Sequence, residues 1–572
     1  MKKVVLVLVG ALVVASAGLE ASDNFGCGSS ENVTACKFTA EDTCAPSGNC
    51  PEPTVRAFNK SGPRVSAISY RSNYDPAFQG ARPEKITAFR LGRIYARDNG
   101  FGGAVQIVPF GGQTTNAKAL AEYLMPFGKS ELVVRGGSGV TPTNADIDAK
   151  AFNIFTTSAD TSFESRICFR PQQTTAGLGF TWRQKLCANE EERGFYFALS
   201  APITHVTNKL NFKEEVITDG GTADTTEGLF YAQPNMTSAF QQERFLAGRI
   251  ECNPNNKGSS VTRLGDLDLR IGYGWNREDM YHFESYIGVL APTGNSVKGC
   301  SIFEPVVGHD KHVGLLFGSA AGFQLWENVE KGYSIRTELA IHSIFLGTNT
   351  QRRAIDVRDS PWSRYLPVYC NQAAAEAAFN ASGGGLANQG GSMYTSGINV
   401  FTPELRVEGR FRRRYNSAWL LRTEHMEVEA GFNFFAVDAE RITLKEEWSG
   451  QYAFLHAAAQ SDVLSAISGN AAPGATTRFR KINNDALDTV AASDLAEVSA
   501  AYQQNIIRAE DLDLYSAGAP CTTQYGFYGS FSYRWDEIEY PTALSAGGSF
   551  EFASDNSGFD RWLAWGKLAV SY

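Results

Sequence analysis

Residues 266–275 decide the fold class, and they read DLDLRIGYGW. Every second position from Leu267 to Trp275 is aliphatic or aromatic. The alternate positions begin with the ionisable Asp266, Asp268 and Arg270 and continue with glycine. Successive side chains of an extended strand point to opposite faces, so one face here is apolar and the other begins as ionisable. This alternation is typical of a strand in a transmembrane β-barrel, which meets lipid on one side and the lumen on the other.

The same alternation recurs through the C-terminal half of the chain. It covers residues 281–289, 313–325, 333–345, 404–412, 419–435, 524–535, 540–552 and 562–572. Residues 404–412 place five ionisable side chains on one face, at Glu404, Arg406, Glu408, Arg410 and Arg412. Since such a face cannot lie in hydrocarbon, we expect it to line an aqueous lumen. The alternative is a soluble sheet sandwich whose polar face meets bulk water.

The lengths of the connections favour the barrel. Predicted connections near residues 276–279, 328–332, 415–416 and 536–539 are short, whereas those near 292–311, 347–396 and 438–520 are long. On the side of the long connections, only the last connection, near residues 554–558, is short. Outer-membrane barrels join their strands by short periplasmic turns and longer external loops, and this is the order observed.

Further strands are predicted upstream, and the count defines the fold class. They cover residues 86–96, 101–110, 131–135, 151–156, 163–170, 176–185 and 194–204. We therefore predict an all-β fold, a transmembrane antiparallel β-barrel of about 16 strands within a range of about 14–18. Short helices are expected in loops, at residues 118–125, 454–467 and 485–507, and the barrel with its long external loops (about 205–264, 347–396 and 438–520) is expected to occupy residues 65–572.

Both ends of the chain carry targeting patterns. Lys2 and Lys3 precede an apolar run over residues 4–14, and residues 15–17 have the small-x-small pattern of a signal-peptide cleavage site. We expect residues 1–17 to be removed, with residue 21 as the alternative end, and the chain to reach the bacterial outer membrane. The last strand ends on alternating Trp562, Leu568, Val570 and Tyr572, which resembles the signal that the barrel assembly machinery reads.

The ten cysteines indicate disulfide bonds, because an exported chain meets an oxidising compartment. Cys27, Cys36, Cys44 and Cys50 crowd into residues 18–64, which we expect to form a periplasmic or lumen-plugging segment. A zinc site is the alternative for these four residues. The pairing of the cysteines does not follow from the sequence.

A short stretch resembles a known family. Residues 264–269 read LGDLDL, Tyr273 follows, and residues 290–294 read LAPTG. This combination is similar to a bacterial outer-membrane family named for the phenol meta-cleavage pathway and related to long-chain fatty-acid transporters. The match spans residues 264–294 of 572, and Ala291 departs from the usual apolar residue. The resemblance implies a barrel and uptake of hydrophobic or aromatic small molecules.

The expected function is passive transport of small solutes through a charged lumen, with outer-membrane lipid as the surroundings. The predicted lumen-lining residues are Asp266, Asp268, Arg270, Glu284, Arg336, Glu338, His342, Glu404, Arg406, Glu408, Arg410 and Arg412. Wall-to-wall ion pairs that close the lumen, and adhesion or binding through the external loops, are the alternatives. The net charge of -9 argues against nucleic acid and anionic-lipid partners.

No sequence motif supports an enzyme, a metal or a cofactor. None of the seven histidines lies in a motif that supplies a nucleophile, and we assign no catalytic residue. His309 and His312 lack a third ligand that would define a metal site. The glycine-rich residues 383–391 do not match a phosphate-binding loop.

Overall fold

The computed structural model describes residues 102–136, 145–152, 154–156, 162–188, 193–222, 233–241, 245–249, 258–277, 280–358, 360–369, 394–454, 475–476, 490–491, 506–535, 537–554 and 558–572. The predicted signal peptide, the cysteine-rich segment with Cys27, Cys36, Cys44 and Cys50, and the strand expected at residues 86–96 lie outside these ranges. So do most of the two helices expected at residues 454–467 and 485–507.

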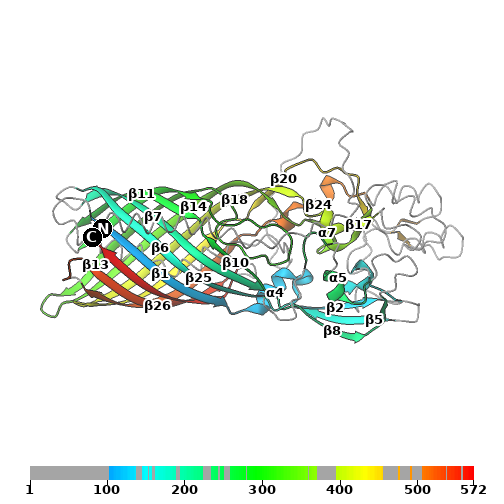
Figure 1. Ribbon diagram of the computed structural model, residues 1–572, viewed down its shortest axis with the longest axis horizontal. Helices are drawn as coiled ribbons and strands as arrows, with labels where there is room; N and C mark the ends of the chain where they lie inside the picture. Colours follow the sequence, from blue (N-terminus) through cyan, green and yellow to red (C-terminus); the bar gives the residue numbers. More distant parts are fainter. Residues whose placement is uncertain are drawn as a thin grey trace.

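Twelve antiparallel strands close into a barrel (Figure 1). In chain order they are β1 (Gly103–Thr114), β6 (Gln172–Ala188), β7 (Arg193–Lys209), β11 (Leu267–Arg277), β12 (Tyr281–Ala291), β13 (Gly314–Asn328), β14 (Tyr333–Arg352), β18 (Glu404–Arg422), β19 (Met426–Val437), β25 (Thr522–Trp535), β26 (Thr542–Ala553) and β27 (Arg561–Ser571). The ring closes because β1 pairs with both β27 and β6. Two short strands continue it at one end: β10 (Ser259–Leu264) along β7, and β20 (Arg441–Leu444) along β18.

The outer wall of the barrel is apolar, as a lipid-facing surface requires. Ile271, Ile287, Leu315 and Phe527 come from four different strands and are 54%, 69%, 55% and 62% exposed. A charged side chain at such a position costs about 2–4 kcal/mol at the bilayer midplane. The ionisable residues of the same strands accordingly take the alternate, inner positions. The prediction of a transmembrane antiparallel β-barrel is confirmed.

Short turns join the strands at one end of the barrel. One predicted turn is wrong: residues 415–416 lie inside β18, which continues to Arg422 and turns at residues 423–425. Asn416 resembled a turn residue, but its backbone pairs with Ala340 of β14 on one side and Asn433 of β19 on the other. Backbone hydrogen bonding to strands on both sides stabilises Asn416 in β18, and this outweighs the preference of asparagine for turns.

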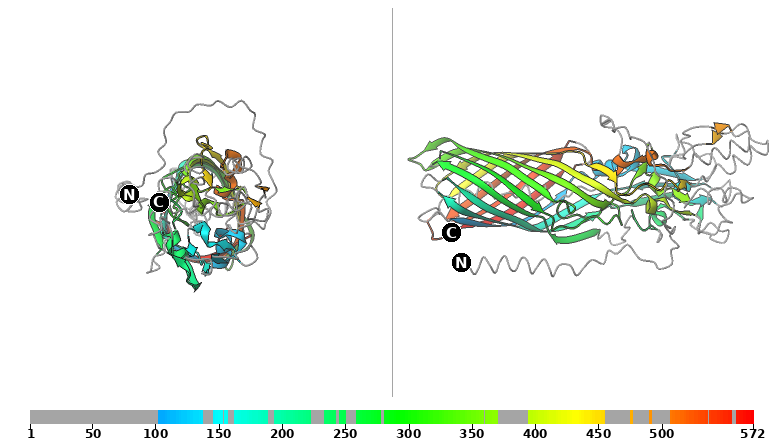
Figure 2. Two further views of the ribbon diagram at one scale, coloured as in Figure 1. Left: turned by 90° about the vertical axis from the view of Figure 1, so that its right-hand side faces the viewer. Right: turned by 90° about the horizontal axis from the view of Figure 1, so that it is seen from above.

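The long connections fold into a cap at the other end (Figure 1). Its apolar core brings together Leu124 of α4 (Ala117–Leu124), Phe163 of β5 (Phe163–Cys168), Phe240 of α5 (Met236–Phe240), Phe303 and Trp362. These residues come from loops far apart in the sequence and are at most 1% exposed. Seen along the barrel axis in Figure 2, the cap elements lie over the barrel. The loops therefore build a packed layer of structure over the external mouth.

The barrel has four strands fewer than the predicted 16: three predicted strands belong to this cap, and the fourth, at residues 86–96, lies outside the described residues. Residues 131–136 and 163–168 form β2 (Glu131–Gly136) and β5, which join β3 (Ile147–Asp148) and β8 (Lys213–Thr218) in a separate four-stranded sheet. Residues 151–156 fall in η4 (Ala149–Phe152) and β4 (Phe155–Thr156), which pairs with β9 (Gly221–Thr222). Alternation shows that one face of a strand is apolar, but not whether lipid or a protein core covers that face.

The remaining elements lie in the cap and its links to the barrel. They are η3 (Pro126–Gly128), β15 (Asp356–Val357), η5 (Ser363–Tyr365), β16 (Pro367–Tyr369), β17 (Tyr394–Ser396), α7 (Gly397–Val400), β21 (Ala453–Phe454), β22 (Ala475–Thr476), β23 (Val490–Ala491), η7 (Ala509–Asp511), β24 (Leu512–Asp513) and η8 (Leu514–Ala517). Across the described ranges, no helix is long and apolar enough to cross a membrane.

The last strand has the two faces that its sequence predicts. Trp562 and Leu568 point outward and are 40% and 43% exposed, and Val570 is half-buried on the same side. The hydroxyl of Tyr572 accepts a hydrogen bond from Trp182 Nε1 at 2.8 Å and donates one to Gln184 at 3.0 Å. The inward Leu563 and Trp565 pack on Val108 and Phe110 of β1. Recognition of this strand by the assembly machinery stays a prediction.

Candidate functional site: the charged lumen and its inward-folded loop

Eight of the predicted lumen-lining residues lie on inner positions of the barrel. They are Asp266, Asp268, Arg270, Glu284, Arg336, Glu338, His342 and Arg412, and each is at most 9% exposed. Because ionisable groups with so little exposure contact protein rather than open solvent, they must be compensated by neighbours.

The other four residues are a correction. Glu404, Arg406, Glu408 and Arg410 lie on the outer side of β18, where all but the intermediate Glu408 are exposed. The backbone of Arg410 is left-handed, with φ of 54°, and the alternation of β18 changes phase there.

Above this point the apolar residues of β18 turn inward instead. Leu405 and Val407 are both 0% exposed and pack on Ile355, Phe401 and Ile442 at the base of the cap. The apolar and ionisable residues still alternate in the sequence through this change, so their pattern does not reveal that the two faces of the strand have exchanged.

One wall of the lumen carries a chain of ion pairs and ring contacts. Arg183 of β6 reaches Glu284 of β12, with Nη1 and Oε2 2.9 Å apart. Arg270 of β11 donates from Nε to Asp268 at 2.6 Å and lies over the ring of Tyr286, 4.6 Å from its centroid. The Arg183–Glu284 pair spans the inner faces of β7 and β11, which lie between its two strands, and the Arg270–Tyr286 contact joins the neighbouring strands β11 and β12. These contacts therefore stiffen the wall as well as compensate its charge.

Two histidines continue this wall. His282 of β12 lies 3.0 Å from Glu338 of β14, and His342 lies 2.6 Å from the hydroxyl of Tyr286. All four side chains are at most 6% exposed. His342 therefore serves as a hydrogen-bonding group and His282 lies at ion-pair distance from a carboxylate, and these contacts place neither histidine beside a serine or cysteine.

The opposite wall holds ionisable groups that the sequence analysis missed. Glu551 of β26 accepts from Arg561 Nε of β27 at 2.7 Å, and Glu429 of β19 accepts from the hydroxyl of Tyr528 at 2.9 Å. Further inner residues are Arg414, Glu427, Arg534 and Lys567. The alternation in these strands could have identified them, because each falls between apolar outward positions.

A loop that enters the mouth is the most distinctive feature of the site. Residues 292–313 connect β12 to β13, and Val297, Phe303, Val306 and Val307 of this loop are at most 5% exposed. An external loop would normally lie in solvent. Here it is packed beneath the cap, and two groups of polar contacts hold it.

The first group centres on Asp266, in the break between β10 and β11. One carboxylate oxygen accepts from the backbone N–H of Gly294 at 3.0 Å, and the other accepts from the backbone of His309 at 2.6 Å and its Nδ1 at 2.8 Å. The hydroxyl of Thr293 donates to the carbonyl of Gly265. The two parts of the family-like pattern, at residues 264–269 and 290–294, are therefore bound to each other.

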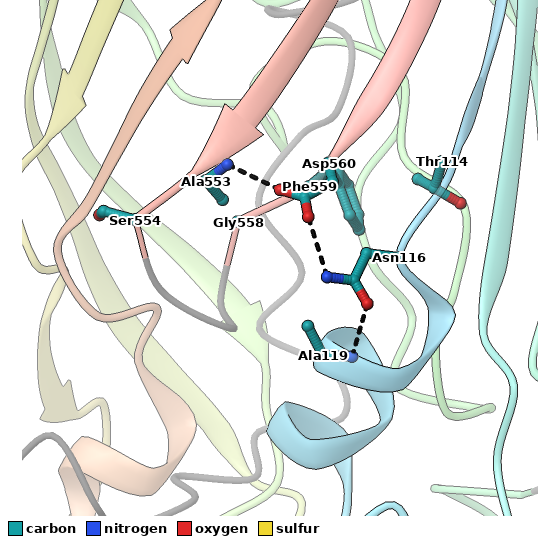
Figure 3. A pocket seen from close by; sticks show the side chains of 8 residues that line it. All are labelled: Thr114, Asn116, Ala119, Ala553, Ser554, Gly558, Phe559 and Asp560. Atoms are coloured by element: carbon teal, nitrogen blue, oxygen red, sulfur yellow. Dashed lines mark hydrogen bonds between the residues drawn. The ribbon is translucent and has the colours of Figure 1, made fainter.

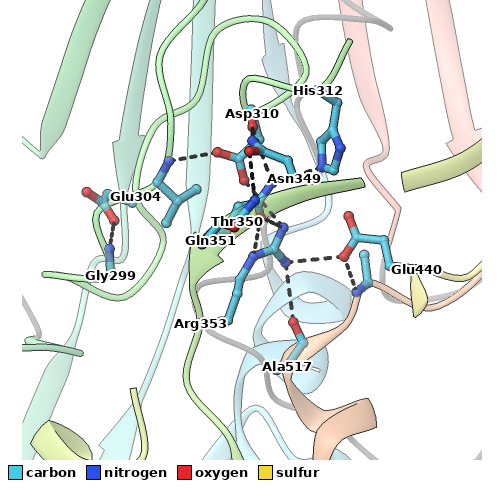
Figure 4. A network of polar contacts seen from close by, with 12 residues as sticks. Gly299, Glu304, Asp310, His312, Asn349, Thr350, Gln351, Arg353, Glu440 and Ala517 are labelled. Carbon is cyan, nitrogen blue, oxygen red and sulfur yellow. Dashed lines mark hydrogen bonds and ion pairs between the residues drawn. The ribbon is translucent and has the colours of Figure 1, made fainter. Parts of the chain in front are cut away.

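The second group centres on Arg353, which is 1% exposed (Figure 4). Its guanidinium donates to Asp310 at 3.3 Å, Glu440 at 3.2 Å and the oxygen of Gln351. Gln351 also contacts His312 Nε2 at 2.9 Å. The cluster joins the loop to the extension of β14 and to the segment after β19, so it ties three connections together at the mouth.

Burial changes the protonation of the groups in and near the loop. Desolvation raises the pKa of Glu304 to about 7, although the backbone N–H groups of Gly299 and Lys298 oppose this shift. It lowers the pKa of His312 to about 4 and raises the pKa of Asp310. His312 is therefore neutral at pH 7, and its Nδ1 donates to the carbonyl of Gly347 at 2.7 Å.

A small hollow of about 390 Å³, including space open to solvent, lies at the external end of the seam between β27 and β1 (Figure 3). Asp560 on its wall accepts from the backbone of Ala553 at 2.8 Å and from Asn116 Nδ2 at 2.9 Å. Asn116 in turn caps α4 through the N–H of Ala119. The polar residues of the hollow therefore join the rim of the barrel to the first helix of the cap.

The cysteines and metal-binding residue types add no further site within the described ranges. Cys300 takes part in a disulfide bond, while Cys168 and Cys521 are free thiols. Among the described residues no group of three or more His, Cys, Asp or Glu could hold a metal ion.

No protein-family model and no curated protein matches the chain. Among solved structures, it is similar to an outer-membrane channel from Pseudomonas putida F1, with 8% identity, 82% of this chain and 96% of that chain covered, and a TM-score of 0.35. It is similar to the TodX monoaromatic hydrocarbon channel (8% identity, 89% and 98% covered, TM-score 0.32) and to the β-domain of the Bordetella autotransporter BrkA (7% identity, 83% and 100% covered, TM-score 0.29). At these identities and TM-scores, the likeness adds no argument about what the chain does.

Proposed function

We propose that this protein is an outer-membrane channel for the passive passage of small solutes. The observation that carries the proposal is the contrast between an apolar outer wall and a lumen lined by ionisable groups on all sides. Replacing buried ion pairs by well-packed apolar residues is often neutral or stabilising, so a barrel that served only as an anchor gains little from a charged core. A charged lumen is useful where solutes and water pass through it.

The inward-folded loop and the packed ion pairs make this a gated passage. Residues 292–313 occupy the mouth, and the lumenal charges are compensated by one another. Passage then requires the loop or the lumenal side chains to move. We favour small water-soluble solutes because of the charged lining, with aromatic solutes, which the family resemblance implies, as the competing substrate class.

Single-channel recording of the folded protein in a planar bilayer tests the proposal. We expect discrete conductance steps that are short-lived because the loop blocks the mouth for most of the time. Liposome swelling with sugars, amino acids and monoaromatic alcohols then separates the two substrate classes. A protein whose folding is verified by heat-modifiable migration, yet which neither conducts nor admits any of these solutes, contradicts the proposal.

Binding or adhesion through the cap is the second candidate, favoured by the cap's own packed core and four-stranded sheet. Tyr369 of β16 pairs with Tyr394 of β17, so the chain ends flanking residues 370–393 lie side by side. Replacing that segment with a short linker leaves the cap's described core in place. Loss of cell binding with unchanged conductance supports this second function.

A further inference from the structure

Four arginines gather on the outer side of the barrel wall, outside the site described above. Arg406, Arg410 and Arg413 of β18 and Arg441 of β20 are exposed and form what we name the basic patch. Strand pairing places the two strands together, because Glu408, between Arg406 and Arg410, is the register partner of Arg441. From this register and the exposure of its members, we propose that the basic patch binds the phosphate groups of a phosphorylated glycolipid in the outer leaflet.

The height of the patch on the wall supports a lipid partner. Below Arg410, the outward residues of β18 include Phe411, Tyr415, Trp419 and Leu421. Residues 411–421 make eleven positions, and about 9–11 residues of tilted strand cross the hydrocarbon of a bilayer. The one charged outward side chain among them, Arg413, lies at the upper end of this span, close to Arg410. Arg410 and the patch residues above it therefore lie at the level of the lipid headgroups, on the side of the long external loops.

The neighbouring rings place acyl chains directly below the arginines. The ring of Phe411 lies 4.9 Å from that of Phe345 on β14 and 6.2 Å from that of Phe317 on β13. Arg413 lies over the Phe411 ring at 5.2 Å, so its apolar stem can follow the wall while its guanidinium reaches upward. One lipid molecule could thus contact the rings with its chains and the arginines with its headgroup.

The charge balance of the patch is positive although the net charge of the whole chain is -9, so the overall negative charge does not argue against an anionic lipid at this part of the wall. Two carboxylates accompany the four arginines: Glu408, and Asp438, whose Oδ2 is 3.8 Å from Arg413 Nη2. Farther out, Glu404 pairs with Lys445 at 2.5 Å, so these two charges offset each other. Among the described residues, Arg406, Arg410 and Arg441 enter no ion pair. Guanidinium groups bind phosphate through two parallel hydrogen bonds, which makes phosphate the matching anion.

Native mass spectrometry of the folded full mature chain in detergent tests the inference. The probes are lipid A with two phosphates, the same lipid with one phosphate, and phosphatidylethanolamine. We expect the diphosphorylated lipid to be retained most strongly. The variant R406Q/R410Q/R441Q should bind it roughly tenfold more weakly, since three charge-assisted contacts are lost. The control K118Q/R166Q/K331Q removes three exposed cations elsewhere and should bind it like the parent.

Several outcomes overturn the inference. The first two are equal lipid binding by the patch and control variants, and equal retention of the three lipids. The other two are complete displacement of the lipid by excess inorganic phosphate, and spectra in which the patch joins two copies of the chain instead of binding lipid. If the glutamine variant fails to show heat-modifiable migration, R406K/R410K/R441K replaces it, and we expect weakened but measurable binding because lysine lacks the paired donors. The inference rests on the outer-membrane placement in the proposed function but not on conduction, which should be unchanged in all these variants.

Discussion

At the scale of single residues, Asp266 is the group on which the mouth loop most depends. Its carboxylate is 1% exposed and accepts from Gly294 and twice from His309. Hydrogen bonds to a charged group contribute about 1.5–3 kcal/mol each, and their loss is partial when an amide takes the place of a carboxylate.

We predict that Asp266→Asn lowers the free energy of unfolding by about 2–3 kcal/mol. Urea unfolding in detergent micelles measures this change. Asp219→Asn, at an exposed position of the cap, is the matched control and should leave stability unchanged. Equal effects of the two substitutions would show that the buried contacts of Asp266 contribute nothing special.

His312 predicts a loss of stability in acid. Its pKa falls from 6.5 in the unfolded chain to about 4 in the fold, so the contribution of the neutral ring is fully present above pH 6.5. It is lost as the pH falls from 6.5 toward 4, by about 3 kcal/mol. His312→Gln should flatten the unfolding free energy between pH 7 and pH 4, and an unchanged slope would refute the prediction.

The burial of Glu304 predicts the opposite dependence of the unfolding free energy on pH. Its pKa rises from 4.5 to about 7, so the fold favours the protonated acid and stability falls as the pH rises from 4.5 to 7. Glu304→Gln keeps acceptor and donor atoms without titrating. We expect this variant to be more stable than the parent at pH 7.5 and similar to it at pH 4, as measured by thermal unfolding at both values.

At the scale of elements, the inward loop is held by contacts from three other connections. Arg353→Met should loosen it, because Asp310 and Glu440 then lose their common cationic partner. Leaving buried charges uncompensated costs about 3–5 kcal/mol. We expect longer open times in single-channel records, with Arg358→Met, at an exposed cap position, as the control. Open times that do not change would separate the loop from gating.

At the scale of the whole molecule, lipid surrounds the apolar wall. Ile287→Arg places a charge at a position that is 69% exposed in mid-strand, where it should cost about 2–4 kcal/mol and lower the yield of heat-modifiable protein. Val329→Arg, in a short turn and 81% exposed, should have little effect. In a water-soluble protein both substitutions would be tolerated alike, so this pair of variants tests the membrane placement directly.

The sequence predicts the strands of the barrel better than it predicts which residues line the lumen. Alternation in residues 266–275, 281–289 and 333–345 identified real barrel strands with the correct inner faces, because lipid imposes a two-residue period on every crossing. The same reasoning wrongly predicted that Glu404, Arg406, Glu408 and Arg410 face the lumen, whereas they lie on the outer side of β18. A single left-handed residue, Arg410, reverses the faces without breaking the period.

By itself, the sequence determined that apolar and ionisable residues would separate onto opposite faces of antiparallel strands, since that requirement acts on each strand independently. Only the tertiary structure decided how many strands close the ring, that β2 and β5 join the cap, and that residues 292–313 fold into the mouth. Those outcomes depend on contacts between residues far apart in the chain, such as Asp266 with His309 and Arg353 with Glu440, and a local pattern carries no information about which distant partner a side chain meets.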